Sequence, residues 1–342
     1  MTPTQKTVDF LHGIGLTGKS LLALRDLTDE QFLMLVKASS MMKERKKSGE
    51  HLKEPLLRGK NIALLFEKAS TRTRCSTINA VRDEGGQAEY LGGEGGGTQY
   101  GKKESVKDTA RVLGRLFDGM MYRGFAQKTV EDLAKWSGVP VWNGLTDQWH
   151  PTQILADFQT VIEHFGCLKG LTLAFVGDGR DNVCNSLMVG CAKAGINMID
   201  VCPPELSPAE SLVAECQAIA ARNGCQISVS HDPEKGCAGA NILYTDVWVS
   251  MGEEALFRQR YQLLRPFQVD MQMARSTGNL DNGRLIFLHC LPAFHDHETT
   301  VSREVGAMEV SDEVFEAPFS KVFDEAENRM HSIKAMILAS LA

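Results

Sequence analysis

The 342-residue sequence lacks several features that would place it in the common membrane and secreted classes. No stretch approaches the roughly eighteen consecutive apolar residues of a membrane-spanning helix. Residues 1–20 have neither the apolar core of a signal peptide nor the arginine richness of a transit peptide. The nine cysteines form no C-x-x-C pair, and their odd number fits reduced thiols better than a disulfide framework or a zinc ribbon. These absences predict a soluble, cytoplasmic protein.

An excess of basic charge is also missing. The 37 Lys and Arg residues are outnumbered by 43 Asp and Glu residues, which gives a net charge of −6 and argues against a nucleic-acid partner. The basic run at 43–47 has no interleaved aromatic residues, so it is interpreted as a solvated helix end. A chain of this length exceeds the usual size of a single hydrophobic core, which predicts two domains.

Apolar runs with the length of buried strands alternate with segments of helical spacing along the chain. Strands separated by helices of this length indicate parallel βαβ units. The predicted fold class is α/β, with two doubly wound parallel-sheet domains joined by interdomain helices. The first domain is expected at 1–150, completed by a C-terminal helix at 326–342, and the second at 151–325. The expected strands are 61–65, 88–91, 119–122, 139–142, 171–177, 198–202, 226–230, 242–246 and 285–290.

The stretch FEKASTRTRC at 66–75 carries the strongest chemical signal. It follows the expected strand 61–65 and precedes a segment, 76–82, that can form a helix. Hydroxyls and backbone N–H groups at the start of a helix lie at the positive end of its dipole. Arginine forks match phosphate oxygens two at a time. We therefore expect a phosphate site at 70–74. The alternative is a solvated helix start with two arginines facing water.

Polar residues follow other expected strands, where open α/β sheets place their ligand crevices. Arg123 follows one strand, and His150 and Gln153 follow another, with Pro151 at the expected helix start. In the second half, Asp246 and Ser250 lie on a turn after a strand. Arg329 is expected near the start of the C-terminal helix, where it can serve as a further phosphate-facing guanidinium if the chain returns to the first domain.

Three other kinds of site are weakly supported. A dinucleotide turn after the strand at 171–177 would need glycine at 182 and finds asparagine. The histidines and cysteine between 289 and 297 do not have zinc-ligand spacing, so no metal is expected. Cys290 as an acyl nucleophile would need a base and a water-excluding pocket.

The glycine-rich segment 92–101 is either a linker or a lid, and the helix signal at Ser105 directly after it favours the lid.

Six motifs occur together in a fixed order and resemble those of the ornithine carbamoyltransferases. They are S-T-R-T-R at 70–74, Y-R-G at 122–124, H-P-T-Q at 150–153, D-x-x-x-S-M-G at 246–252, H-C-L-P at 289–292 and E-N-R-M-H at 327–331. The resemblance runs from about Leu16 to the C-terminus. The first and third motifs alone indicate only the wider family, which includes the aspartate enzyme, whereas S-M-G at 250–252 marks ornithine as the acceptor.

The resemblance implies transfer of the carbamoyl group of carbamoyl phosphate to the δ-amine of L-ornithine, giving citrulline and phosphate in arginine metabolism or biosynthesis. It also implies a homotrimer or a multiple of trimers, with no cofactor, no metal, no nucleic acid and no membrane partner. Two alternatives remain open. One is a carbamoyltransferase with another acceptor, such as lysine, putrescine or an acylated ornithine, and the other is a non-catalytic protein that binds a phosphate ligand.

The resemblance also assigns roles to individual residues. Catalytic roles fall to Arg72, Arg123, His150 and Cys290. Carbamoyl phosphate is bound by Ser70, Thr71, Arg72, Thr73, Gln99, Arg123, His150, Gln153, Cys290, Leu291 and Arg329. Ornithine is held by Asn182, Asp246, Ser250 and Met251. The sequence departs from the family pattern in the extra glycine near 92–97, in Lys102 where histidine is usual, and in Asp181 where asparagine is frequent.

Overall fold

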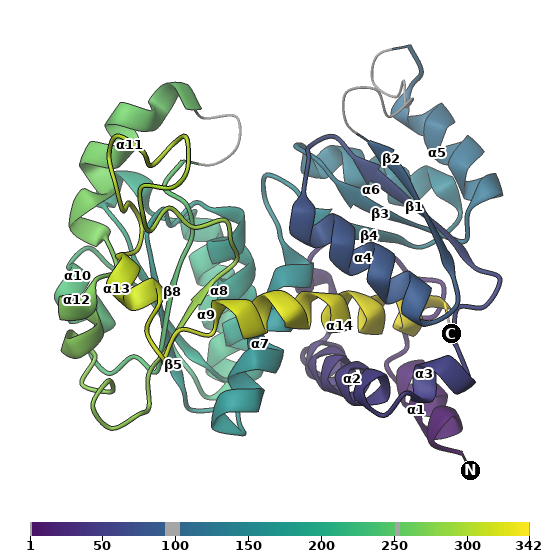
Figure 1. Cartoon of the computed structure of the whole chain (residues 1–342), viewed down its shortest axis with the longest axis horizontal. Helices are drawn as coiled ribbons and strands as arrows, with labels where there is room; N and C mark the ends of the chain where they lie inside the picture. Colours follow the sequence, from purple (N-terminus) through teal and green to yellow (C-terminus); the bar gives the residue numbers. More distant parts are fainter. Residues whose placement is uncertain (1, 93–102, 250–253, 342) are drawn as a thin grey trace. The chain divides into compact units, whose positions relative to one another are not determined.

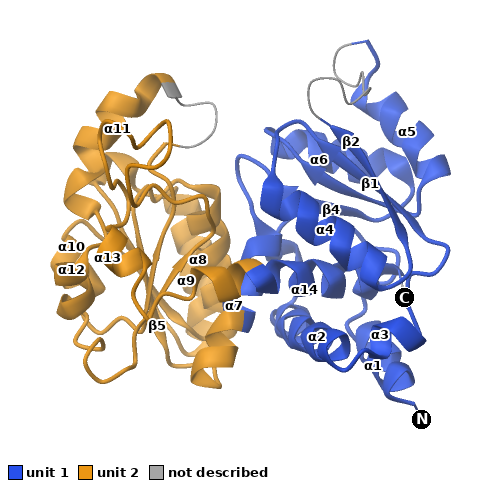
Figure 2. Ribbon diagram, in the orientation of Figure 1, with its two compact units in different colours: residues 1–159, 327–342 blue, residues 160–326 orange. Residues whose placement is uncertain are grey.

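The computed structural model describes residues 2–92, 103–249 and 254–341. The chain forms two compact units, which Figure 2 shows in different colours. Unit 1 comprises residues 1–159 and 327–342, and unit 2 comprises residues 160–326. Within the described ranges, no helix is both long and apolar enough to cross a membrane.

Unit 1 contains a four-stranded parallel sheet in the order β2-β1-β3-β4. The strands are β1 (Asn61–Phe66), β2 (Gln87–Gly92), β3 (Gly119–Arg123) and β4 (Val141–Leu145). The connections are helices α4 (Thr71–Asp83), α5 (Val106–Leu116) and α6 (Gln127–Ser137). One face of the sheet packs Ala63, Leu65, Met120 and Tyr122 against apolar residues of α5 and α6. Because all strands are parallel, their carboxyl ends meet at one edge of the sheet.

A second group of helices completes unit 1. It contains α1 (Pro3–Gly13), the 3₁₀ turn η1 (Leu24–Asp26), α2 (Asp29–Lys47), α3 (Glu50–Lys53), the first part of α7 (Pro151–Phe165) and the last part of α14 (Val322–Leu341). Figure 1 shows α1, α2 and α3 gathered beside α14. A capping box opens α2, because Thr28 Oγ1 accepts from Gln31 N and Gln31 Oε1 accepts from Thr28 N.

Unit 2 contains a five-stranded parallel sheet in the order β7-β6-β5-β8-β9. Helices α8 and α9 pack together, and α10, α12 and α13 form a second group, which Figure 1 shows on the other side of the sheet. The predicted class, two doubly wound parallel-sheet domains, is confirmed. The strands are β5 (Thr172–Val176), β6 (Asn197–Val201), β7 (Ile227–Ser230), β8 (Ile242–Thr245) and β9 (Ile286–His289). The helices are α8 (Asn182–Ala194), η2 (Pro204–Leu206), α9 (Glu210–Asn223), α10 (Pro233–Cys237), η3 (Glu254–Leu256), α11 (Phe257–Leu264), η4 (Arg265–Phe267), α12 (Met271–Ser276) and α13 (Asp312–Phe315).

Several helix starts differ from the expected ones. Helix α4 begins at Thr71 rather than at residue 76, because the Ser70 hydroxyl accepts a hydrogen bond from Thr73 N and caps the helix there. The sequence predicts Arg329 near the start of the C-terminal helix. Helix α14 begins at Val322, so Arg329 instead lies in its interior. The acidic residues Asp324 and Glu325 occupy its first turn, where their negative charges interact favourably with the positive end of the helix dipole. Helix α1 had no predicted counterpart.

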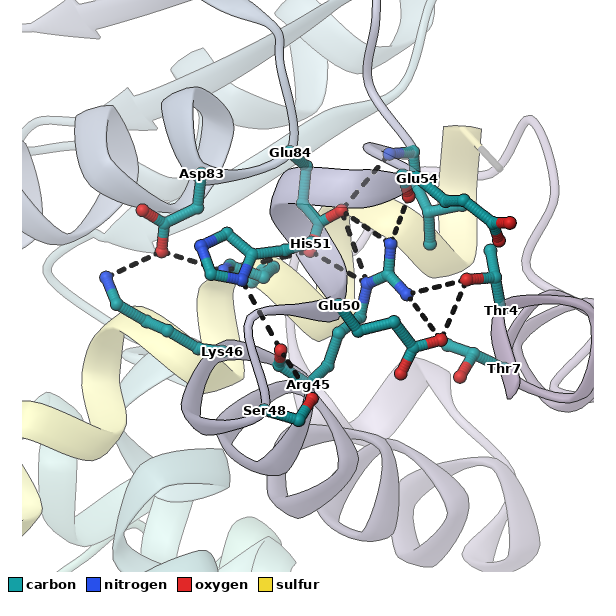
Figure 3. A network of polar contacts seen from close by, with 12 residues as sticks. Thr4, Thr7, Arg45, Lys46, Ser48, Glu50, His51, Glu54, Asp83 and Glu84 are labelled. Atoms are coloured by element: carbon teal, nitrogen blue, oxygen red, sulfur yellow. Dashed lines mark hydrogen bonds and ion pairs between the residues drawn. The ribbon is translucent and has the colours of Figure 1, made fainter. Parts of the chain in front are cut away.

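A buried ion-pair network ties the helices of unit 1 together. Figure 3 shows Arg45 of α2 at its centre, bonded to Glu84 after α4 and to Thr4 of α1. Arg45 Nε lies 3.2 Å from Glu84 Oε1, and both side chains are almost fully buried. Glu84 Oε2 also accepts from Leu56 N at 3.1 Å. The network therefore joins α1, α2 and the segment after α4 through two buried, opposite charges, and Arg45 also lies 3.1 Å from Glu50 of α3.

We predict that Glu84→Ala destabilises unit 1 strongly. The substitution removes the fully buried carboxylate partner of Arg45 and leaves the partly exposed one of Glu50, which lies 3.1 Å from Nη1. Breaking one partner of a buried pair costs about 3 to 5 kcal/mol. Chemical denaturation followed by circular dichroism measures the loss. Glu44→Ala is the matched control, since Glu44 lies exposed on the same helix as Arg45. A Glu84→Ala protein that unfolds at the wild-type denaturant concentration would show that the pair contributes little.

Candidate active site

The carboxyl edge of the unit 1 sheet carries the predicted phosphate loop. Strand β1 ends at Phe66, and four residues later Ser70 caps α4. The first turn of α4 contains Thr71, Arg72 and Thr73. A capped first turn of a thirteen-residue helix directs its N–H groups and its positive dipole end outward, which favours an anion. The local geometry therefore suits a phosphate.

Two distant arginines converge on Thr73 of this turn. Arg123, the last residue of β3, donates from Nη1 to Thr73 Oγ1 at 3.2 Å. Arg329 of α14 donates from Nη2 to the same oxygen at 3.1 Å. Because this hydroxyl oxygen accepts from two guanidinium groups, its own proton is available to donate to an anion. Segments 256 residues apart in the chain thus meet at one hydroxyl.

His150 lies beside the same group of cations. Burial lowers the pKa of His150 well below its usual value, and the charges of Arg329, Arg123 and Arg72 lower it further. The imidazole is therefore neutral at neutral pH, with one ring nitrogen that donates and one that accepts. Nδ1 lies 3.4 Å from Thr152 Oγ1. A neutral histidine among three guanidinium groups can donate a hydrogen bond to a polarised carbonyl oxygen without adding charge.

Residues of the H-P-T-Q motif hold Arg329 in place. Arg329 donates to Gln153 Oε1 and, at 3.2 Å, to Thr152 Oγ1. Gln153 Nε2 in turn donates to Asp157 Oδ1 at 2.7 Å, one helical turn further along α7. Arg329 is 2% exposed and Gln153 is 1% exposed, so both side chains are held in a packed environment.

Gly124 allows the Y-R-G segment to approach its neighbours closely. A Cβ at this position would lie 2.1 Å from Tyr122 Oη and 2.2 Å from Glu67 Oε2. Tyr122 donates to Glu67 Oε2 at 3.0 Å, and Phe125 N donates to the same oxygen at 2.9 Å. The bond from Tyr122 and the bond from Phe125 fix the backbone on both sides of Arg123.

In unit 2, a turn after β5 presents two polar residues. Asp181 caps α8 by accepting from Val183 N at 2.7 Å, and Asn182 is the first helical residue. The Oδ1 atom of Asn182 is buried and has no hydrogen-bond partner among the described residues. Burial raises the pKa of Asp181 well above its usual value, and the charge of Asp246 raises it further. The turn therefore offers an unused amide oxygen beside a carboxyl group.

The H-C-L-P segment forms a second turn in unit 2, after β9. Leu291 N donates to His289 Nδ1 at 2.9 Å, so the ring proton lies on Nε2, which faces Glu309 Oε1 at 3.3 Å. His289 N also donates to Glu325 at 2.9 Å. Leu291 has a φ of 58°, a left-handed conformation that is uncommon for a residue other than glycine. Strained backbone of this kind gathers at functional sites.

Asp246 and Cys290 lie together in this part of unit 2. Burial raises the pKa of Asp246, whereas His289 and a hydrogen bond from Cys290 lower it. Burial raises the pKa of the Cys290 thiol well above its usual value, and the charge of Asp246 adds to this effect. Cys290 is therefore a neutral thiol at neutral pH, which does not favour a thiolate nucleophile. The ligand atoms of Asp246, His289 and Cys290 lie within 4.8 Å of one another, but both ring nitrogens of His289 are engaged in hydrogen bonds or ion pairing.

The structure brings together part of the predicted residue set in each unit. Three predicted residues, Gln99, Ser250 and Met251, lie outside the described residues. Sequence reasoning missed the supporting groups Asp157, Glu309 and Glu325. For Asp157 a signal existed, since it follows Gln153 by one helical turn. Unit 1 gathers Ser70, Thr71, Arg72, Thr73, Arg123, His150, Gln153 and Arg329, and unit 2 contains Asn182, Asp246, Cys290 and Leu291.

Comparisons with known proteins divide the chain near the same place, between residues 159 and 169, although the second match also includes residues 327–340 of unit 1. Residues 19–163 match the carbamoyl-P binding domain of aspartate/ornithine carbamoyltransferases, and residues 169–340 match their Asp/Orn binding domain. The catabolic ornithine carbamoyltransferase of Bacillus licheniformis is 53% identical over 334 residues, which cover 96% of this chain and 98% of that relative.

Solved structures of the same name are also similar. The ornithine carbamoyltransferase of Pyrococcus furiosus is 39% identical, with a TM-score of 0.86, and the match covers 95% of this chain and 98% of that one. The anabolic enzyme of Campylobacter jejuni is 32% identical, with a TM-score of 0.81, and the match covers 93% and 97%. The chain therefore belongs to the aspartate/ornithine carbamoyltransferase family.

Proposed function

We propose that this protein is an ornithine carbamoyltransferase, which transfers the carbamoyl group of carbamoyl phosphate to the δ-amine of L-ornithine and releases citrulline and phosphate. The observation that carries the proposal is the convergence of Arg72, Arg123 and Arg329 around the neutral His150 at the start of α4. Three cations and a helix start suit a doubly charged phosphate.

In this proposal, unit 1 binds carbamoyl phosphate. Arg72, the first-turn N–H groups and the hydroxyls of Ser70, Thr71 and Thr73 hold the phosphate. Arg123, His150 and Gln153 contact the carbamoyl group, and Arg329 orients this set. Attack by the amine forms a tetrahedral centre with an oxyanion, and donors aimed at that oxygen stabilise the transition state. The C–O bond to phosphate then breaks, and the phosphate leaves with the bonding electron pair.

Unit 2 binds ornithine in this proposal. Asp246 pairs with the α-ammonium group, and the side chain of Asn182 contacts the amino acid end of ornithine. The δ-ammonium group of ornithine gives one proton to solvent before the attack, and the backbone carbonyls of Cys290 and Leu291 accept hydrogen bonds from the resulting amine. Once the C–N bond has formed, the nitrogen loses a second proton to the departing phosphate. Ser250 and Met251 complete the ornithine site, and Gln99 reaches the neighbouring subunit of a homotrimer. We also place the protein in the cytoplasm.

The assembly that we propose is a homotrimer or a multiple of trimers, as the resemblance implies. Helix α5 offers side chains that such an interface could cover, since Val112 is 50% exposed and Leu116 is 65% exposed. Sedimentation equilibrium tests the oligomeric state.

The physiological direction of the reaction is a separate property, because relatives named catabolic and anabolic both resemble this chain. The rival acceptors lysine, putrescine and acylated ornithine differ from ornithine in chain length or in the α-substituents that Asp246 would contact.

A citrulline assay tests the proposed function. The protein is incubated with carbamoyl phosphate and each acceptor in turn, and the carbamoylated product is quantified. We expect ornithine to give the highest kcat/KM. A higher kcat/KM with lysine, putrescine or an acylated ornithine would change the assigned acceptor. Calorimetric binding of carbamoyl phosphate without turnover of any acceptor would instead favour a non-catalytic phosphate-binding protein.

Cys290→Ala provides a separate test of the mechanism. If the backbone carbonyl of residue 290 carries the function, the alanine variant keeps it, and we expect kcat to fall by less than about tenfold. Removing an essential nucleophile would instead cost roughly 10⁶-fold. Steady-state citrulline formation distinguishes the two outcomes, and Cys167→Ala, which removes an exposed thiol, is the control.

A further inference from the structure

Unit 2 buries a carboxyl group that the proposed mechanism does not use. Asp200, the fourth residue of β6, is fully buried. Its Oδ2 accepts from the Cys202 thiol at 3.7 Å, a weak hydrogen bond. Its Oδ1 is buried and has no hydrogen-bond partner among the described residues. An ionised carboxylate would be costly in these surroundings, because it would lack strong donors.

The turn that precedes α8 packs directly on this carboxyl group. A Cβ at Gly179 would lie 2.2 Å from Asp200 Oδ2 and 2.8 Å from the Leu206 carbonyl oxygen. Only a residue without a side chain can therefore occupy position 179 while Asp200 keeps its place. The same turn, 177–182, carries Asp181 and Asn182, so the carboxyl group supports the backbone that presents both residues.

Burial and the charge of Asp178 favour the protonated form of Asp200. Burial raises the pKa of Asp200 to about 7, and the charge of Asp178 raises it as well, whereas hydrogen bonds from Cys202 and Cys184 lower it. The thiol pKa values of Cys184 and Cys202 are themselves raised by burial, so both thiols are neutral. Cys184 comes from α8, Cys202 follows β6, and Asp178 comes from the turn.

Cations near this group are already engaged by Asp178. Arg180 bonds Asp178 Oδ1 through its backbone N at 3.0 Å and through Nε at 3.1 Å. Arg260 of α11 lies 2.8 Å from Asp178 Oδ2. His231, after β7, contacts the Cys202 carbonyl at 2.8 Å through Nδ1. The hydrogen-bond donors to Asp200 are therefore neutral thiols, whereas the guanidinium groups of Arg180 and Arg260 pair with the carboxylate of Asp178.

We propose that Asp200 is a positioning residue for the acceptor site: its protonated carboxyl group holds the turn 177–182 in the binding conformation, and loss of the proton displaces this turn and weakens acceptor binding. This inference rests on the proposed role of Asn182 in ornithine binding. An ionised Asp200 gains hydration only if the groups packed on its carboxyl group move, and the Gly179 backbone is packed on Oδ2.

Kinetics across pH test the proposal with a neutral isostere. Wild type and Asp200→Asn are compared from about pH 6 to 8.5 for the KM of ornithine and for inhibition by L-norvaline, which has the same α-amino acid group but no δ-amine. Dividing each wild-type constant by the constant of the variant at the same pH cancels the titrations that both proteins share, including those of Asp246 and of the ornithine amine. We expect similar constants at pH 6. Above pH 7 the wild-type constants should be about fivefold higher or more, a typical coupling between sites.

Several outcomes decide the matter. The KM for carbamoyl phosphate should have the same pH dependence in both proteins, and Asp281→Asn, which changes an exposed carboxylate of unit 2, should behave like wild type. A ratio that stays flat with pH, or that falls as pH rises, overturns the proposal. Asp200→Ala should raise the KM for ornithine at every pH, because it removes the support itself. If Asp200→Ala does not fold, the isosteric variant alone decides.

Stability supplies a readout that needs no turnover. The pKa of Asp200 is about 7 in the folded protein, whereas the pKa of an aspartate in an unfolded chain is about 4. Wild type should therefore lose stability relative to Asp200→Asn as pH rises through this window, and the difference should stay constant above it. If no acceptor yields a product, the proposed function fails while this measurement still stands. If citrulline forms but the KM ratio does not change with pH, the proposed role of Asp200 fails while the proposed function stands.

Discussion

Replacing Arg72 by alanine is expected to lower kcat/KM for carbamoyl phosphate by roughly 10²- to 10³-fold, the usual effect of removing one donor to developing charge. Arg72 lies in the first turn of α4, and its charge acts on His150 together with those of Arg123 and Arg329. The variant should keep the wild-type fold, since Arg72 is only partly buried. Steady-state citrulline formation at varied carbamoyl phosphate measures the loss.

Two comparisons make this test specific. Arg72→Lys keeps the charge but removes the fork that matches two phosphate oxygens, so it should recover only part of the activity. Arg82→Ala removes an exposed arginine from the last turn of the same helix and should leave kcat/KM near the wild-type value. Equal losses in Arg72→Ala and Arg82→Ala would mean that the helix start has no special role.

Asp246→Asn is expected to lower kcat/KM for ornithine by roughly 10²- to 10³-fold, because truncating one side of a buried charge pair costs about 2 to 5 kcal/mol. Asparagine has the same shape but cannot neutralise the α-ammonium group. Burial raises the pKa of Asp246 in the free protein, so binding of the cationic group should release a proton from the fraction that is protonated. The KM for ornithine should rise, and the KM for carbamoyl phosphate should stay within about threefold.

Calorimetry provides a second measurement of the same prediction. Titrating L-norvaline into the wild type in buffers of different ionisation enthalpy reports the proton released on binding, and Asp246→Asn should abolish that release. Asp281→Asn is the matched control, because its carboxylate is exposed in the same unit. An Asp246→Asn enzyme with a wild-type KM for ornithine would remove Asp246 from the acceptor site.

Strands were predictable from the sequence, and so were the helix starts at Pro151 and after Ser105, whereas the starts of α4 and α14 were not. Apolar runs such as 61–65 and 171–177 have a length and bounds that match β1 and β5 within two residues. The S-T-R-T-R motif was expected to precede a helix at 76–82, yet Thr71–Arg74 already belong to α4. The Ser70 side chain accepts from Thr73 N, and this contact places the helix start earlier than the apolar pattern indicates.

Motifs at strand ends predicted the content of the unit 1 site, because parallel strands bring their carboxyl ends to one edge. The role of Arg329 required the return of the chain through α14, and its three hydrogen-bond partners could not be read from spacing. Asp200 gave no signal at all. It stands in an apolar strand, and only the packing of Gly179 on its carboxyl group reveals it.

A crystal structure of the protein with carbamoyl phosphate tests the central claim most directly. We predict that the phosphoryl oxygens contact the first turn of α4 at Ser70–Thr73 and the Arg72 guanidinium, with the carbamoyl oxygen within hydrogen-bond distance of Arg123 and His150. A phosphate bound elsewhere on the protein, with those two side chains remote from the carbamoyl group, would contradict the account.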